Sequence, residues 1–200
     1  ALIEAMQEKQ VTIEGKTLPL PDPFFVIATR NPVETEGVYP LPEAQLDRFM
    51  IKSDMEYLSP DEELDMLKVK QTNVEFDEVR TVGDGFGFEI RNMYQKVYAA
   101  EKVLEYIRDI VLETRNVEEL VLGASPRAGE QLLYASKAHA ILDGRDYLIP
   151  DDVKKISPKV IPHRLILSVD AELEGISKKD VVNDILEERV EAPKGDFKRD

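Results

Sequence analysis

From residue 59 onward, apolar residues recur with the three- and four-residue spacing of helices that bury one face. Ser59 and Ser125, each followed by proline, suit the N-terminal cap and first position of a helix. The pattern predicts helices that begin at residue 59 and then span residues 103–114, 125–142, 150–160 and 178–189. Leu104, Ile107 and Val111 are expected to lie on one face of the helix over residues 103–114. Such a series predicts a compact helical domain.

The N-terminal part carries a different pattern, in which short elements alternate. Residues 1–6 fit the apolar face of a helix, and a turn at Gly15 predicts a β-hairpin over residues 11–20. The continuous apolar run at residues 24–28 predicts a central strand covered on both faces, and residues 49–51 predict a further strand. Two strands and a hairpin are too few for a doubly wound sheet, so this α/β unit is expected to be incomplete.

Composition narrows the class of protein. The 200 residues are 42% hydrophobic and 33% charged, which is typical of a globular chain with one domain or two small ones. No apolar run approaches the roughly 18 residues of a membrane-spanning helix, and the N-terminal residues lack the pattern of a signal peptide. The chain has no cysteine, which excludes disulfides and fits a reducing compartment, so a cytoplasmic location is predicted. The net charge of −14 argues against general affinity for nucleic acid.

Common catalytic and metal-binding motifs are absent from the sequence. There is no G-x-x-x-x-G-K-[ST] phosphate loop, and no H-E-x-x-H or paired-histidine pattern, so no metal ligand is predicted. His139 lies inside a predicted helix among alanines, and His163 follows Pro162 at a helix end. Both histidines are interpreted as structural.

Three polar residues stand in unusual settings. Asn31 follows the predicted strand and precedes Pro32, so it either forms a turn or places an amide at the end of the sheet. Arg48 ends a short acidic segment. Its charge is either favourable there because it lies near the C-terminus of a helix, or it pairs with Asp47. Arg127 lies in the first turn of a predicted helix, which is unfavourable for a cation by roughly 0.3–1 kcal/mol unless an anion is near. Arg127 is therefore a candidate anion-binding residue.

The longer motifs carry a family resemblance. The runs EAMQEKQVTI, FFVIATRNPVETEGVYPLPEAQLDRF and LGASPRAGEQLLYASKAHAILDGRDYLIPDDV closely resemble the MoxR family of AAA+ ATPases, from residue 1 to about residue 193. The resemblance is weakest at residues 81–90, where the glycines differ from the family pattern. It implies a fold of class α/β plus all-α. That fold is the C-terminal part of a AAA+ P-loop NTPase core, with a partial parallel sheet and a β-hairpin insert, followed by an α-helical lid domain. The implied boundaries are 1–56 for the partial core, 57–193 for the lid and 194–200 for a frayed tail.

The resemblance also implies roles for the three polar residues. Asn31 would be sensor 1, which helps to orient the attacking water near the γ-phosphate of ATP. Arg48 would be the arginine finger, which reaches the nucleotide of a neighbouring subunit. Arg127 would be sensor 2, carried by the lid, and the hairpin over residues 11–20 would be an insert that in such rings often faces the central pore. ATP and Mg²⁺ are the implied ligands.

The phosphate loop and the acidic Mg²⁺-binding strand of the family are expected upstream of Ala1. Both ligands would require that segment, so the 200 residues alone are predicted not to hydrolyse ATP. The whole protein is predicted to form a homo-oligomeric ring, a hexamer, that remodels or matures a client protein complex in a chaperone-like way. Proteins with von Willebrand A domains are the implied partners, without nucleic acid binding or membrane insertion. Two alternatives remain open: a non-catalytic helical interaction module, and a DNA-related AAA+ motor.

Overall fold

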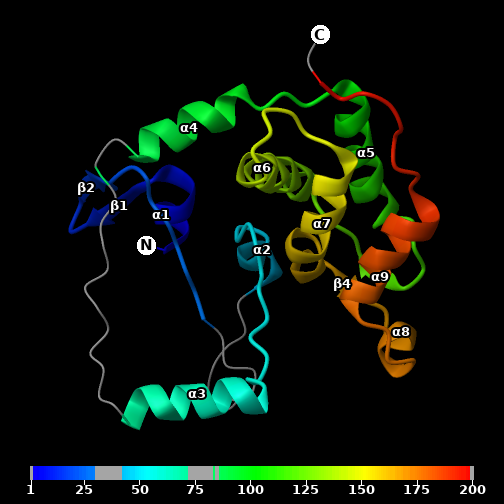
Figure 1. The fold of residues 1–200 in the computed structure, drawn as a ribbon, viewed down its shortest axis with the longest axis horizontal. Helices are drawn as coiled ribbons and strands as arrows, with labels where there is room; N and C mark the ends of the chain where they lie inside the picture. Colours follow the sequence, from blue (N-terminus) through cyan, green and yellow to red (C-terminus); the bar gives the residue numbers. More distant parts are fainter. Residues whose placement is uncertain (1, 30–41, 72–82, 84–85, 199–200) are drawn as a thin grey trace.

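A computed structural model describes residues 2–29, 42–71, 83 and 86–198 of the chain (Figure 1). The elements in chain order are α1 (Leu2–Glu8), β1 (Gln10–Ile13), β2 (Lys16–Pro19), α2 (Glu43–Leu46), α3 (Pro60–Gln71), α4 (Phe86–Lys96), α5 (Glu101–Glu113), β3 (Leu120–Leu122), α6 (Pro126–Leu142), α7 (Pro150–Val160), the 3₁₀ turn η1 (Pro162–Arg164), β4 (Ile166–Leu167), α8 (Val169–Leu173), α9 (Lys178–Asp184) and the π-helical turn η2 (Ile185–Arg189).

The hydrophobic core lies among α5, α6, α7 and α9, which gather on one side of the molecule in Figure 1. Ile110, Leu132, Val153 and Val182 are fully buried there, one from each helix. The helices predicted from the apolar spacing are therefore confirmed, with α9 continuing into η2 near residue 189. Of the three residues expected on one face of α5, Ile107 and Val111 are buried, whereas Leu104 is 41% exposed at the edge of the buried stripe.

The N-terminal hairpin forms as predicted, with β1 and β2 antiparallel and Ile13 paired with Lys16. The strand predicted at residues 24–28 is wrong: the segment has no regular secondary structure, and Phe25 and Ile27 are 81% and 90% exposed. The strand predicted at residues 49–51 is also not formed. A buried strand needs hydrogen-bonded neighbours on its edges, and the described residues place none beside either segment.

Two short pairings that the sequence did not predict close the helical domain. β3 pairs antiparallel with β4, which ties the connection before α6 to the connection after η1. Tyr98 forms an isolated parallel bridge with Tyr147, so the start of α5 lies beside the loop that enters α7. Because both pairings join segments that flank α6 and α7, they fix where these two helices begin.

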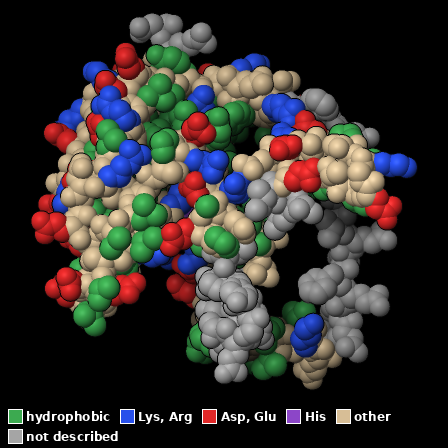
Figure 2. Space-filling model, turned by 180° about the vertical axis from the view of Figure 1, so that it is seen from behind, with side chains coloured by type: hydrophobic (Ala, Val, Ile, Leu, Met, Phe, Trp, Pro, Cys, Tyr) green, Lys and Arg blue, Asp and Glu red, His purple; other side chains and the backbone are tan. Residues whose placement is uncertain are grey.

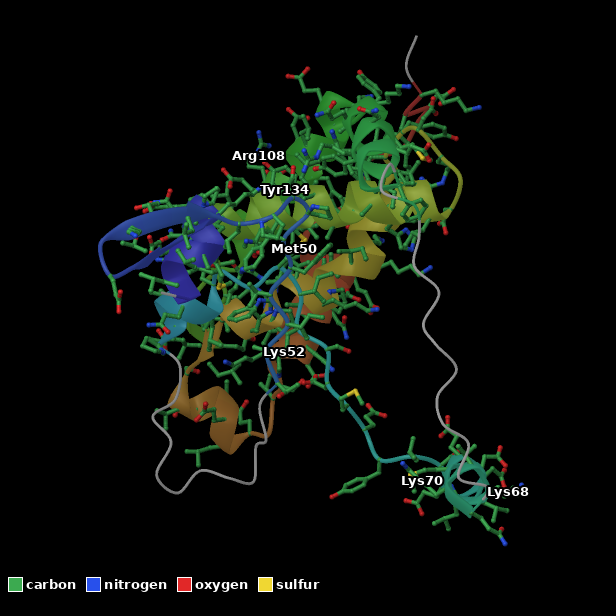
Figure 3. The ribbon with its side chains drawn as sticks, turned by 90° about the vertical axis from the view of Figure 1, so that its left-hand side faces the viewer. Met50, Lys52, Lys68, Lys70, Arg108 and Tyr134 are labelled. Atoms are coloured by element: carbon green, nitrogen blue, oxygen red, sulfur yellow. The ribbon has the colours of Figure 1, made fainter. Side chains whose placement is uncertain are left out.

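Helices α3 and α4 are among those that lie outside this core. α4 joins the two halves of the structure: Arg91 donates to Asp22 at 2.6 Å, and Tyr94 packs edge-to-face on Tyr134 of α6. α3 has no buried residue and lies away from the other helices, as the positions of Lys68 and Lys70 in Figure 3 show. None of the helices in the described ranges is long and apolar enough to cross a bilayer.

Candidate functional site

The three residues singled out from the sequence fall at different places in the structure. Arg48 follows α2, the short helix that Figure 1 shows beside α6 and α7. Arg127 lies in the first turn of α6. Asn31 lies outside the described residues. The structure therefore relates two of the three candidates to each other.

Asp47 is the side chain that connects the two. Arg127 donates from Nη1 to Oδ2 of Asp47 at 3.2 Å, and the hydroxyl of Ser125 lies 3.1 Å from both carboxylate oxygens. Ser125 occupies the N-cap position of α6, but its hydroxyl bonds to Asp47 instead of a backbone N–H of the helix. The anion that a cation in this first turn requires is thus supplied by the residue next to Arg48.

Arg164, in η1, holds the same carboxylate from the other side. Its Nε donates to Oδ1 of Asp47 at 3.0 Å, and its side chain is 1% exposed. Nη2 also donates to the backbone carbonyls of Asp47 at 3.1 Å and Phe49 at 2.6 Å, and to the side-chain oxygen of Gln131. Burial lowers the pKa of Arg164, and the charge of Asp47 opposes that shift. The guanidinium is therefore buried, its carboxylate partner is 19% exposed, and the pair is multiply hydrogen-bonded, which offsets the cost of burying the charge.

The segment after Arg48 is bound to the helical domain along its length. Lys52 donates its backbone N–H to the carbonyl of Lys159 at 3.0 Å. Asp54 pairs at 2.8 Å with Lys179 of α9 and at 2.8 Å with Lys52, and these two hydrogen bonds lower the pKa of Asp54 to about 2. Figure 3 shows Met50 and Lys52 running alongside the helices of this domain. Residues 47–54 therefore form one continuous strip on the domain that carries Arg127.

The residues that follow α5 hold the N-terminus of α6 in place. Thr114 donates its hydroxyl to the carbonyl of Val111 at 2.6 Å and accepts from the backbone N–H of Ala124 at 2.9 Å. Arg115 donates to the carbonyl of Ala124 at 3.0 Å. Gly123 allows this close approach, because a Cβ there would lie 2.4 Å from the carbonyl oxygen of Thr114. Ser125 and Arg127 are thereby held at one point on the domain.

Arg48 itself is half-buried and turned back along α2. Its Nε donates to the carbonyl of Ala44 at 3.2 Å, and its Nη1 is buried without a hydrogen-bond partner among the described residues. The guanidinium therefore makes no ion pair with Asp47, which was one interpretation of this residue from the sequence. Asp47 is directed instead to Arg127 and Arg164.

The arrangement suits the binding of a phosphate at Arg127. The side chain of Arg127 is 40% exposed and reaches its carboxylate partner through one 3.2 Å hydrogen bond, which a phosphate oxygen can replace. Asp47 stays paired with Arg164 in that exchange. Elsewhere on the surface the charges are interspersed. Figure 2 shows acidic and basic side chains mixed over the face that it presents.

A second polar cluster, between α6 and α7, does not fit a metal. His139, Asp143 and Asp152 are the one group in the described part of the chain whose ligand atoms come within 4.8 Å of one another. Arg145 donates to Asp152 at 2.6 and 2.8 Å and to Asp143 at 3.1 Å, so a guanidinium already neutralises these carboxylates. The side chain of Asp152 is 1% exposed and also accepts from the backbone of Ile149. The interpretation of His139 as structural fits this cluster, which joins two helices.

Comparisons with known proteins identify the class. Residues 1–51 match the family model of the ATPase family associated with various cellular activities (AAA), and residues 112–185 match that of the AAA lid domain. The uncharacterized protein YeaC of Bacillus subtilis is 46% identical over 188 residues, which cover 93% of this chain and 58% of YeaC. The chaperone MoxR1 of Mycobacterium tuberculosis is 39% identical over 197 residues, which cover 94% of this chain and 52% of MoxR1. The crystal structure of a Cytophaga hutchinsonii protein assigned as an ATPase matches with a TM-score of 0.88 and 41% identity, and covers 96% of this chain and 61% of that one.

These matches define an AAA-type ATPase segment followed by its lid, and they confirm the predicted fold class. The chain belongs to the MoxR family of AAA+ ATPases, a family with chaperone-like members. It spans about half the length of the curated relatives it matches.

Sequence reasoning missed the two residues that organise the site, Asp47 as a shared acceptor and Arg164 as its buried partner. A signal for Arg164 was present: it stands in the run KVIPHRLIL, where a cation is surrounded by apolar residues. Charged side chains are rarely buried unless paired, so an arginine in such a run predicts a buried ion pair. Its partner, 117 residues away, is not readable from spacing.

Proposed function

We propose that this chain forms the trans-acting and nucleotide-sensing part of an ATPase in which Arg48 is the arginine finger and Arg127 is sensor 2. The observation that carries the proposal is the Asp47 carboxylate, which joins the turn bearing Arg48 to the lid helix bearing Arg127. A phosphate that takes Arg127 away from Asp47 loosens one of the contacts between lid and turn. The nucleotide state of one subunit thereby affects Arg48, the residue that this subunit presents to its neighbour.

In the proposed reaction, water attacks the γ-phosphorus of ATP, and the bond to the bridging oxygen breaks to give ADP and phosphate. Arg48 of one subunit neutralises the charge that develops on the phosphoryl oxygens bound by its neighbour, an effect worth about 10³–10⁵ in rate in comparable reactions. Bound Mg²⁺ would neutralise part of the same charge. We propose Asn31 as the residue that orients the water. The ligands of Mg²⁺ and the phosphate loop are proposed to come from outside the described residues.

A finger that acts across a subunit boundary requires a neighbouring subunit, and a repeated head-to-tail contact gives a ring when its rotation closes. We propose a homo-hexamer in the cytoplasm that couples hydrolysis to the remodelling or maturation of a client complex. Support for a client comes from the relative named a chaperone, MoxR1. Partners with von Willebrand A domains are part of the same proposal.

The test of the finger is Arg48→Ala in the full-length protein. ATP turnover is expected to fall by about 10³-fold or more, while nucleotide affinity stays within about threefold, because the finger binds the neighbour's transition state and not its own nucleotide. Arg108→Ala is the matched control: Arg108 is an exposed arginine of α5 whose ion pair is with its chain neighbour Asp109, at 2.8 Å. Undiminished turnover in Arg48→Ala would remove the finger assignment.

The same proposal predicts that the 200 residues alone neither bind nor hydrolyse ATP. Calorimetric titration of the chain with ATP and Mg²⁺ is expected to give no binding heat. Micromolar binding would show that these residues build a phosphate site without a phosphate loop. If Arg48→Ala and Arg127→Ala leave partner binding intact, the alternative of a non-catalytic interaction module is favoured. Tight DNA binding in a mobility-shift assay at moderate salt would favour the DNA-related motor.

A further inference from the structure

Arg164 contacts the chain on both sides of Arg48. Its Nη2 donates to the carbonyl oxygen of Asp47, immediately before Arg48, and to that of Phe49, immediately after it, at 3.1 and 2.6 Å. Its Nε donates to the Asp47 carboxylate at 3.0 Å. One side chain of the lid therefore fixes two peptide groups and one side chain of a three-residue turn.

This set of contacts is specific to a guanidinium. Arginine presents five N–H donors in a rigid plane, so it can satisfy a carboxylate and two carbonyls at once, whereas lysine is a point charge on a flexible stem. The guanidinium is also anchored within the lid, since Nη1 donates to the carbonyl of Val160 at the end of α7 and Nη2 donates to the side-chain oxygen of Gln131 of α6. The side chain of Arg164 is 1% exposed, so close packing restricts its change to another rotamer.

The contacts of Arg164 extend beyond the hydrophobic core of the lid. The buried core of the lid is complete among its own helices, and the turn at Arg48 lies outside it. A buried charge that reaches out of a core to the backbone of a separate segment fixes that segment in place, and the segment here bears the proposed finger. Arg127 then shares the Asp47 carboxylate with Arg164, so both lid arginines act on one acceptor.

We infer that Arg164 is a positioning residue for Arg48: the lid holds the turn at Arg48 through Arg164 and sets where the finger is presented to the neighbouring subunit. The inference rests on the proposed function, because it assigns Arg164 an effect that is transmitted through the finger. Arg164 contacts no substrate in this scheme. It acts through the backbone on either side of Arg48.

The experiment compares Arg164→Lys and Arg164→Met in the full-length protein with Arg145→Met as the matched control. Arg145 is another largely buried lid arginine paired with a buried aspartate, but it lies in the cluster around Asp152 and does not contact the turn. Three quantities are measured for each variant: kcat for ATP, nucleotide affinity, and the thermal unfolding midpoint. Asp47→Asn provides a second route to the same contact if Arg164→Met does not fold.

Arg164→Lys and Arg164→Met are expected to lower kcat by about 10- to 100-fold with nucleotide affinity within about threefold, as for a displaced catalytic group. Lysine keeps the charge opposite Asp47 and is expected to retain most of the thermal stability without restoring kcat. Arg145→Met is expected to lower the unfolding midpoint and leave kcat per folded molecule unchanged. If Arg164→Lys keeps full kcat, or if the loss of kcat follows the loss of stability across all variants, the inference is overturned.

Arg48→Ala, measured in the same series, separates the two proposals. If Arg48→Ala keeps its turnover, the finger assignment itself fails, whatever Arg164 does. If Arg48→Ala abolishes turnover while both Arg164 variants keep it, the finger stands and only the positioning role is lost.

Discussion

Nε2 of His163 lies 2.9 Å from the carbonyl oxygen of Phe49, so the imidazole is one of the contacts that bind the turn after α2 to the lid. The same nitrogen lies 2.7 Å from Nη1 of Arg164, and Nδ1 is buried without a hydrogen-bond partner among the described residues. Burial, followed by the charges of Arg164 and Lys52, lowers the pKa of His163 from 6.5 to about 4, against the opposing effects of Phe49 and Asp47. His163 is therefore neutral in the folded protein at pH 6.

Folding stability is expected to fall as the pH drops from 6.5 towards 4. In that window the unfolded chain binds a proton at His163 and the folded chain does not, so acid favours unfolding. A shift from 6.5 to about 4 corresponds to about 3 kcal/mol for this group. Denaturant unfolding at several pH values measures it, with His163→Gln as the variant in which this part of the slope should disappear. An identical pH slope in the protein and the variant would contradict the lowered pKa.

Arg127→Ala is expected to separate stability from nucleotide binding. The pair with Asp47 is partly exposed, so its loss changes the free energy of unfolding by less than about 1 kcal/mol. Asp47 keeps Arg164 and Ser125 as partners, and no buried charge is left alone. In the full-length protein, nucleotide affinity is expected to fall by about 10-fold or more, the loss of one charge-assisted hydrogen bond.

The measurements are denaturant unfolding and nucleotide titration of the same preparations. Arg127→Lys is the companion variant, which keeps the charge and should recover part of the affinity. Unchanged affinity in Arg127→Ala would remove the sensor 2 assignment. A loss of several kcal/mol in stability would instead assign Arg127 a role in holding the fold.

The helices of the lid were predictable because their signals are local. The proline at the first position of α6, and the apolar spacing in α7 and α9, are signals that act within a few residues of the helix they predict. Residues 24–28 show the limit of such signals. An apolar run of that length predicts a strand, but a strand forms only where another segment supplies its hydrogen bonds, and that information is not in the run itself.

The candidate site was predictable in part for the same reason. Arg127 was singled out because a cation in the first turn of a helix is locally unfavourable, and the structure supplies the expected anion. That the anion is Asp47, 80 residues earlier, follows only from how α2 packs on the lid. From its sequence neighbours alone, Arg164 is interpreted as part of a helix end. Its role follows only from its hydrogen bonds to the turn at Arg48, which the structure shows.

Two glycines near the start of α6 are expected to respond in opposite directions to alanine. At Gly123 a Cβ would lie 2.4 Å from the carbonyl oxygen of Thr114 and 2.8 Å from Cγ of Arg115. Since the nearer atom belongs to the backbone, Gly123→Ala must displace the chain, with an expected loss of about 1–3 kcal/mol. At Gly129, inside α6, a Cβ would meet Val111 and Ile107 at 3.7 and 3.9 Å, ordinary contact distances. Gly129→Ala is therefore expected to stabilise the protein by about 0.5–1 kcal/mol.

Denaturant unfolding of the two variants side by side tests this pair, because the chemical change is identical and only the surroundings differ. The displacement at Gly123 should also reach Ser125, since Ala124 between them is held by Thr114 and Arg115. Nucleotide affinity of the full-length Gly123→Ala variant is therefore expected to fall together with stability, whereas that of Gly129→Ala stays unchanged. Equal and small effects at both positions would mean that the end of α5 yields to the new methyl group and does not hold the start of α6 in place.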